Sequence, residues 1–213
     1  MKAKPTYIDL TMPLDENVPV FPGHAVPIIT QKATLAKEGW SEKELTINAH
    51  HGTHVDFPAH MFEGGKAQCA YPIDTFIGKG KIFDVRNKSE ISVQKDVLDA
   101  NVTEGDIVLF CTGRSAYYRD FQKYHTEASM LTEAFADALI EKKVKAIGLD
   151  AWSVDKGKPF TIHKKLLAND ILIVENMVNL EKLLGKAFTL FVAPINLQAF
   201  DGSPCRAFAE VEG

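Results

Sequence analysis

Four short apolar runs, spaced through the last two-thirds of the chain, constrain its fold more than any other feature. They are KIFDV (81–85), DIVLFC (106–111), KAIGLD (145–150) and DILIVEN (170–176). Turn residues or charges bound each run, which is typical of strands buried in a sheet. All four are far too short to cross a bilayer. The sequence therefore predicts a sheet whose buried strands are separated by longer connections.

Helical spacing appears between these runs. A helix is predicted to start at Thr132, because apolar residues recur at helical intervals from Phe135 to Val144 and lysines follow, where they suit the helix dipole. Strands alternating with a few helices predict an α/β chain with a mixed sheet, in a single domain over residues 1–213. Further predicted segments are helices over 92–100 and 163–169 and strands over 7–11, 26–36, 44–49 and, as the last strand, 188–195.

The composition limits the classes of function. A formal net charge of −4 gives no electrostatic reason to expect nucleic acid or an anionic membrane as a partner. No apolar run near the N-terminus is long enough for a signal-peptide core. Cys69, Cys111 and Cys205 form no CxxC pair, and they are predicted to be buried, reduced thiols. We therefore expect a cytoplasmic domain that acts on a small-molecule substrate.

Four of the seven histidines lie in one stretch, NAHHGTHVDFPAH. The i, i+4 spacing of His50 and His54 would place both on one face of a helix. A helix is disfavoured, however, because Gly52 lowers helix propensity and Pro58 breaks a helix. In an extended chain His54 and Asp56 project to the same side, and Gly52 allows a tight bend that brings His50 round to them.

These residues offer the donors of a metal site. Two imidazoles and a carboxylate, from His50, His54 and Asp56, suit zinc or manganese. A set without cysteine favours a catalytic site over a structural one. His60 lies close by, where it could serve as general acid or base. His51 points away from His50 in an extended chain and is predicted either to support the metal ligands through a hydrogen bond or to be structural. The alternative interpretation is a solvated loop with one or two hydrogen-bonded histidines.

A second pair of candidates lies far downstream. Glu175 ends an apolar strand, so its carboxylate would be desolvated unless a metal or another cation receives it. His163 comes twelve residues earlier. From the residues alone both are weak candidates, because Glu175 could equally be an edge carboxylate paired with a lysine. Asp150, at the end of another strand, has the same ambiguity.

Six motifs carry a resemblance to a known family. The chain resembles the cyclase-like metal-dependent hydrolases that include bacterial kynurenine formamidases (arylformamidases), over almost its whole length. The H-x-G-T-H-x-D-x-P-x-H pattern is the most specific of the motifs. They are PVFPG (19–23), HHGTHVDFPAH (50–60), TGR (112–114), GLDAWSVD (148–155), HKKLLANDILIVEN (163–176) and DGSPCRA (201–207).

The resemblance implies up to two divalent ions, Zn²⁺ or Mn²⁺, in each subunit. His50, His54 and Asp56 would bind the first ion. Asp56, His163 and Glu175 would bind the second, with Asp56 and Glu175 shared between the two. The implied fold is an α/β arrangement of the swivelling β/β/α kind, and the implied assembly is a homodimer or homotetramer.

The resemblance also implies the reaction. His60 would carry a proton during hydrolysis of N-formyl-L-kynurenine to L-kynurenine and formate. Phe21 would contact the substrate at a position where the family commonly has tryptophan, while His24 and Trp152 also depart from the family pattern. We expect Trp152 to pack in the core, and we expect residues 201–207 to form a turn lining the pocket. The alternatives are a cyclic amide (isatin-like) or lactone as substrate, or a metal-binding protein without turnover.

Overall fold

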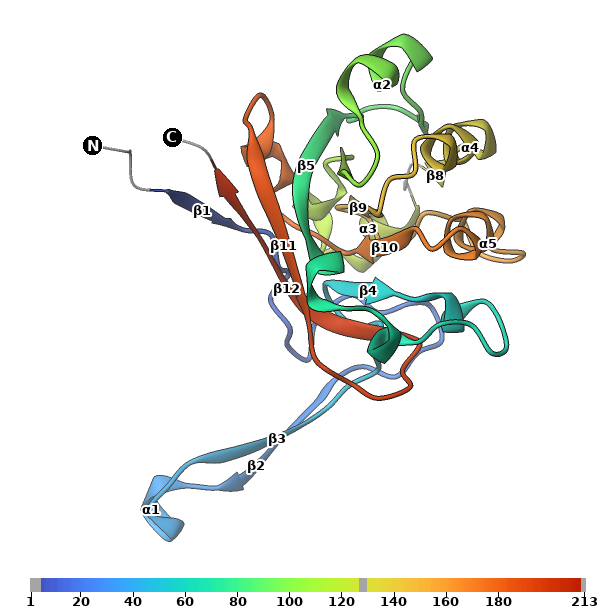
Figure 1. Ribbon diagram of the computed structural model, residues 1–213. Helices are drawn as coiled ribbons and strands as arrows, with labels where there is room; N and C mark the ends of the chain where they lie inside the picture. Colours follow the sequence, from blue (N-terminus) through green and yellow to red (C-terminus); the bar gives the residue numbers. More distant parts are fainter. Residues whose placement is uncertain (1–4, 127–129, 212–213) are drawn as a thin grey trace.

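A closed, mostly buried sheet forms the centre of the computed structural model, which describes residues 5–126 and 130–211 (Figure 1). The order of its strands is β12-β11-β5-β7-β9-β10-β4, and β4 pairs again with β12, which closes a barrel-like ring. A further strand, β1, pairs with residues 208–211 at the C-terminal end of β12. The strands are β1 Thr6–Asp9, β4 His54–Asp56, β5 Ile77–Asp84, β7 Ile107–Cys111, β9 Ala146–Leu149, β10 Leu172–Glu175, β11 Phe188–Pro194 and β12 Gly202–Val211.

The four apolar runs are the parallel part of this sheet. Strands β5, β7, β9 and β10 pair side by side in parallel, while β4, β11 and β12 pair antiparallel to their neighbours. Parallel strands need crossover connections, and helices in these connections cover one face. The prediction of an α/β chain with a mixed sheet is therefore confirmed.

Alternating side chains of the strands build two cores. Residues such as Leu109, Val174 and Ala207 belong to one buried cluster, which fills the ring. Their neighbours, such as Phe110 and Ile173, belong to a second cluster between the parallel strands and the helices. Because β7, β9 and β10 contribute to both clusters, both of their faces are buried, which explains the continuous apolar runs in the sequence.

The predicted helices are present with shifted ends. Thr132 caps the helix after it, and its hydroxyl accepts a hydrogen bond from the backbone N–H of Phe135. The segment predicted from residue 92 begins at Lys95, and the one predicted from residue 163 begins at Thr161. The helices are α1 Leu35–Glu38, α2 Lys95–Asn101, α3 Phe121–Thr126, α4 Glu133–Glu141 and α5 Thr161–Ala168, with 3-10 turns at Pro58–His60, Gln68–Ala70, Ile73–Phe76, Arg114–Tyr117 and Leu180–Leu183.

The C-terminal segment departs from the prediction. Residues 202–211 form the ten-residue strand β12, so 188–195 is not the last strand and 201–207 is not a turn. Gly202 and Pro204 are residue types that are rare in strands, so the beginning of this strand is not apparent from the sequence. Ala207, Ala209 and Val211 point into the ring. Its first three residues pair with β4, residues 205–211 pair with β11, and residues 208–211 also pair with β1, and these pairings stabilise it.

A two-stranded hairpin projects from the body. It is built from β2 Ile28–Ala33 and β3 Glu42–Thr46, with α1 near its tip, and Figure 1 shows it extending away from the barrel. We call residues 26–46 the arm. A second small sheet pairs β6 Glu90–Ile91 with β8 Met130–Leu131.

Two expectations from composition can be compared with the structure. Within residues 5–126 and 130–211, the longest apolar helix falls well short of what a membrane crossing requires. All three thiols are free, and Cys111 and Cys205 are buried as predicted. The prediction is wrong for Cys69, which is exposed because it lies in the short surface turn Gln68–Ala70.

Candidate metal centre and active site

Strand β4 places two of the predicted ligands side by side. His54 and Asp56 are separated by one residue in an extended strand, so they share a face, whereas Val55 points into the ring core. Strand β10 pairs with β4 in a register that sets Glu175 opposite His54. The Nε2 atom of His54 therefore lies 3.3 Å from Asp56 Oδ1 and 3.7 Å from Glu175 Oε2.

A tight bend at Gly52 brings His50 to the same place. Gly52 has φ of +63°, a left-handed conformation that a residue with a side chain rarely adopts. As a result, His50 Nδ1 lies 2.7 Å from Asp56 Oδ1. Gly202 on β12 supplies the space, because a Cβ atom there would lie 2.5 Å from the His50 ring. Donor atoms of His50, His54 and Asp56 all lie within 4.8 Å of one another.

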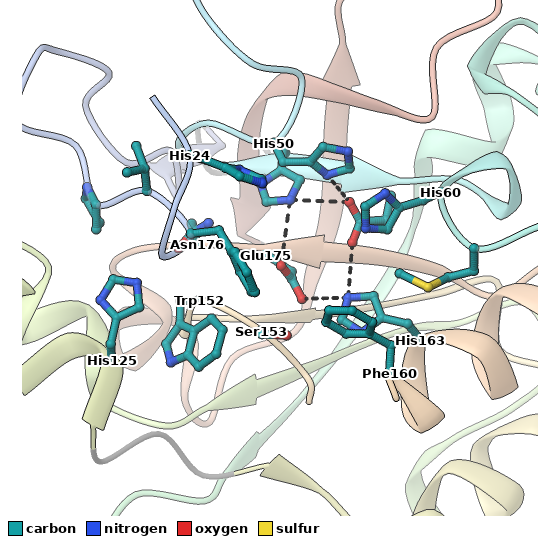
Figure 2. A pocket seen from close by; sticks show the side chains of 16 residues that line it. His24, His50, His60, His125, Trp152, Ser153, Phe160, His163, Glu175 and Asn176 are labelled. Carbon is teal, nitrogen blue, oxygen red and sulfur yellow. Dashed lines mark hydrogen bonds and ion pairs between the residues drawn. The ribbon is translucent and has the colours of Figure 1, made fainter. Parts of the chain in front are cut away.

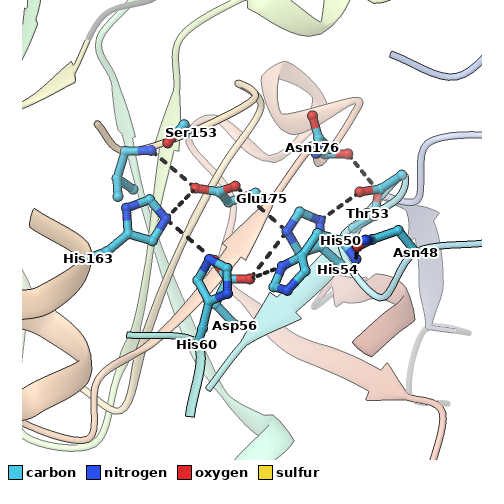
Figure 3. A network of polar contacts seen from close by, with 12 residues as sticks. Asn48, His50, Thr53, His54, Asp56, His60, Ser153, His163, Glu175 and Asn176 are labelled. Atoms are coloured by element: carbon cyan, nitrogen blue, oxygen red, sulfur yellow. Dashed lines mark hydrogen bonds and ion pairs between the residues drawn. The ribbon is translucent and has the colours of Figure 1, made fainter. Parts of the chain in front are cut away.

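Helix α5 contributes His163 from the opposite side (Figure 3). Its Nε2 atom lies 3.5 Å from Asp56 Oδ2 and 3.3 Å from Glu175 Oε1. The Asp155 carboxylate accepts hydrogen bonds from His163 Nδ1 at 2.8 Å and from the backbone N–H groups of Ile162 and His163. One side chain therefore fixes both the first turn of α5 and the orientation of the imidazole.

The second ring nitrogen of His54 and of His50 also makes a hydrogen bond. His54 Nδ1 lies 2.9 Å from the Gly52 carbonyl oxygen, to which it donates, so that Nε2 is free to face the two carboxylates. His50 Nε2 lies 3.1 Å from Asp201 Oδ2. Such contacts on the far side of a ring orient an imidazole for metal binding.

The cluster fits a divalent metal. Asp56 is 1% exposed, and its Oδ2 atom has no hydrogen-bond partner, an arrangement that is costly unless a cation receives it. Burial opposes ionisation of Asp56, but the imidazoles of His54 and His50 hold its pKa well below the usual range. Burial likewise opposes protonation of His163, but Asp155, Asp56 and Glu175 raise its pKa well above the usual range. Positive charge is therefore strongly favoured here, and nitrogen and oxygen donors without cysteine suit a divalent ion.

His60 lies beside this cluster at the end of a 3-10 turn. Its ring centroid is 4.2 Å from that of His50 and 6.0 Å from that of His163. Its Nδ1 atom lies 3.2 Å from Asp201 Oδ2. His60 is half-buried and lines the cavity, so its ring can reach both the cluster and a bound molecule.

The cluster opens into a cavity of about 260 Å³ with an aromatic wall (Figure 2). Phe21 lies 5.6 Å from Trp152 and 6.4 Å from Phe160, measured between ring centroids. His24 also lines the cavity, 5.3 Å from Phe21. Trp152 packs against a small core cluster as predicted, and in addition it lines the cavity.

The other predicted or overlooked residues lie around this centre. His51 is buried beside the cluster, and its Nδ1 accepts a hydrogen bond from the Asn48 backbone N–H at 3.2 Å. Asp150 lies apart from the cluster and accepts hydrogen bonds from the loop at residues 112–115. Sequence reasoning missed Asp155 and Asp201, although each stands at one end of a motif that carries the resemblance, GLDAWSVD and DGSPCRA respectively.

The donor set fits a metal-dependent enzyme, and comparison with known proteins identifies its class as a metal-dependent amide hydrolase. The chain belongs to the family described as Putative cyclase, whose model matches residues 8–156, more than half of the chain. It is 30% identical to kynurenine formamidase of Bacillus cereus (strain ATCC 14579) over 205 residues, 94% of this chain and 95% of that one. It is also 30% identical to kynurenine formamidase of Bacillus cytotoxicus over 211 residues, 97% and 98% of the two chains.

Solved structures agree in fold. A potential metal-dependent hydrolase with cyclase activity aligns with a TM-score of 0.80 at 26% identity and covers 99% of both chains. A predicted metal-dependent hydrolase from Bacillus stearothermophilus aligns with a TM-score of 0.81 at 27% identity, covering 98% of this chain and 99% of that one. An isatin hydrolase bound to the product analogue thioisatinate has a TM-score of 0.89 at 20% identity, covering 98% and 93%.

Proposed function

We propose that the protein is an arylformamidase that hydrolyses N-formyl-L-kynurenine to L-kynurenine and formate. The observation that carries this proposal is the convergence of three imidazoles and two carboxylates at one end of a cavity with an aromatic wall. The kynurenine formamidases among the relatives support the same substrate at 30% identity. We also propose that the fold is of the swivelling β/β/α kind that the family resemblance implies.

In this proposal the cluster holds Zn²⁺ or Mn²⁺. His50, His54 and Asp56 would bind one ion, and Asp56, His163 and Glu175 would bind a second, with Asp56 and Glu175 shared between the two. A bound divalent ion supplies Lewis acidity, which lowers the pKa of a coordinated water from about 15.7 towards about 7 and polarises the formyl carbonyl.

The chain's own residues supply orientation and proton transfer. His60 accepts a proton from the attacking water and delivers it to the leaving aryl nitrogen, so that the amine departs neutral. Phe21, together with Trp152 and Phe160, contacts the aromatic ring and holds the formyl group at the histidine end of the cavity. Positioning of this kind lowers the barrier by replacing free encounter with a fixed approach.

Comparison of substrates tests the proposal. We expect metal-loaded protein to release formate and an aromatic amine from N-formyl-L-kynurenine faster than it opens isatin or an aryl lactone, as followed by absorbance and by a formate assay. Preference for the cyclic amide or lactone would establish the alternative substrate for the same site. Turnover of none of the three would instead indicate a binding protein and would contradict the assigned activity.

Phe21→Ala is expected to weaken the binding of aromatic substrates and to leave the binding of aliphatic ones unchanged. Loss of ring contacts costs about 1 kcal/mol, so KM for an aryl formamide should rise about fivefold while kcat changes little. A formamide of a small aliphatic amine serves as the control substrate, and its KM should not change. An unchanged KM for both substrates, or an equal loss for both, would show that Phe21 does not contact the ring.

The expected homodimer or homotetramer stays a proposal, and the arm is its candidate interface. Exposed apolar side chains concentrated on a projecting hairpin are unfavourable in water and favour contact with another chain. These side chains, each about half exposed or more, are Val26, Ile28, Leu35, Trp40 and Leu45.

Introducing negative charges on the arm tests this assembly. Trp40→Glu combined with Leu45→Glu is expected to shift the sedimenting species from a multimer to a monomer. Ile73→Glu, which adds the same charge at an exposed apolar residue outside the arm, is the matched control and should leave the mass unchanged. A wild-type protein that sediments as a monomer at micromolar concentration would rule out this assembly.

A further inference from the structure

We propose that Asp201 is a positioning residue, which holds the metal-ligand candidate His50 and the proton carrier His60 in one fixed arrangement. A single oxygen carries both contacts: Asp201 Oδ2 lies 3.1 Å from His50 Nε2 and 3.2 Å from His60 Nδ1. The inference rests on the proposed function for the roles of the two histidines.

The backbone around Asp201 is fixed to the strand that carries the ligands. Its carbonyl oxygen accepts a hydrogen bond from the Phe57 backbone N–H at 3.0 Å, one residue after Asp56. The next residue, Gly202, pairs with Asp56 in the register between β12 and β4. The pairing of β12 with β4 therefore places the Asp201 carboxylate beside the loop that carries His50.

Gly202 contributes to the same arrangement. The His50 ring lies so close to its backbone that a Cβ atom would come within 2.5 Å. The ring is thus bounded on one side by the β12 backbone, and the Asp201 carboxylate contacts its edge. His50 and His60 then lie with ring centroids 4.2 Å apart and planes tilted by 37°.

The chemistry of the carboxylate sets the tautomers of both rings. An ionised carboxylate only accepts hydrogen bonds, so each nitrogen that faces it carries the hydrogen. A neutral His50 then has its lone pair on Nδ1, the atom 2.7 Å from Asp56 Oδ1, where a cation would be received. A neutral His60 has its lone pair on Nε2, which is the form that can accept a proton from water.

Asp201 acts through the histidines and not on the substrate. It is absent from the residues that line the cavity, whereas His50 and His60 both line it. Carboxylates behind metal-ligating histidines typically contribute about 10- to 100-fold to metal affinity or activity. Both effects are expected here, because one oxygen serves a ligand and the proton carrier together.

Asp201→Ala tests the inference, with Asp201→Asn as a variant of the same shape. We expect kcat to fall about 10- to 100-fold with KM nearly unchanged, and metal affinity, measured by competition with a chelator, to fall by a similar factor. Asp201→Asn should recover part of both losses, because the amide oxygen can still accept a hydrogen bond. Asp99→Ala is the matched control, since Asp99 is similarly exposed and pairs only with lysines in the described ion pairs.

Two further measurements separate positioning from mere support of the fold. In the His60→Ala background and at saturating metal, adding Asp201→Ala should cause no further loss of kcat but should still weaken metal binding through His50. Nitrogen-15 NMR of the imidazoles should show His60 protonated on Nδ1 in the wild type and redistributed in Asp201→Ala. The NMR and metal readouts need no substrate, so they remain decisive if the arylformamidase assignment fails. Unchanged tautomer and unchanged metal affinity in Asp201→Ala would overturn the inference.

Discussion

Asp56→Asn is expected to lose its metal and, with it, essentially all hydrolysis. Asp56 is one of the two carboxylates shared by the proposed metal positions: Oδ1 faces His50 and His54, and Oδ2 faces His163. Asparagine keeps the shape but removes the charge that a divalent ion needs in a site this buried. Activity should fall by more than about 10³-fold, because free water has a pKa of about 15.7 instead of about 7.

Metal content and thermal unfolding measure this result without a substrate. Wild-type protein should be stabilised by added metal, by about 2.7 kcal/mol at a free concentration 100 times Kd, whereas Asp56→Asn should gain little. Asp137→Asn, a surface substitution on α4 that removes a partner of Lys165, is the control and should behave as the wild type. Full metal content together with wild-type turnover in Asp56→Asn would exclude Asp56 as a ligand.

His60→Ala is expected to separate metal binding from catalysis. His60 lies beside the cluster and contacts Asp201, so removing its ring should leave the metal donors in place. General acid–base catalysis contributes about 10²- to 10⁴-fold, and kcat should fall by that factor. Elemental analysis should still find the wild-type amount of metal.

Added imidazole provides a rescue for this variant. The ring removed in His60→Ala lines the cavity, so free imidazole has a space to enter and should restore part of kcat. His60→Gln is the companion variant, because it fills the space without accepting a proton. If His60→Ala lost metal in proportion to its activity, His60 would be a ligand and the role proposed for it would be wrong.

The strands could be predicted from the sequence where both faces of the sheet are buried. The run at 106–111 is apolar throughout because β7 contributes alternately to the inner and outer cores. Strand β12 was missed because small residues, a proline and charges alternate in it, and because its stability depends on pairing with strands far away in the sequence. Strand order depends on the same distant pairings, which no local pattern contains.

The residues of the candidate site likewise fall into those that local sequence predicts and those that depend on distant parts of the chain. His50, His54 and Asp56 could be brought together by local reasoning, because an extended strand and one glycine bend are enough. His163 and Glu175 needed the family resemblance, because α5 and β10 fold back onto β4 only in the complete sheet. Asp155 and Asp201 each stand at one end of a recognisable motif, but neither motif shows which histidine the carboxylate meets. Their hydrogen bonds to His163 and His50 become visible only in three dimensions.

The strand that closes the barrel has a consequence for how the molecule holds together. Strand β4 has only three residues, yet it joins β10 on one side and β12 on the other. Two of the three are donors of the cluster, and the third, Val55, is a core residue. An ion held by His54, Asp56 and Glu175 would bind the folded chain and not the unfolded one, so it would stabilise the contact between these distant parts of the sequence. The ion that takes part in catalysis would then also stabilise the closure of the barrel at β4.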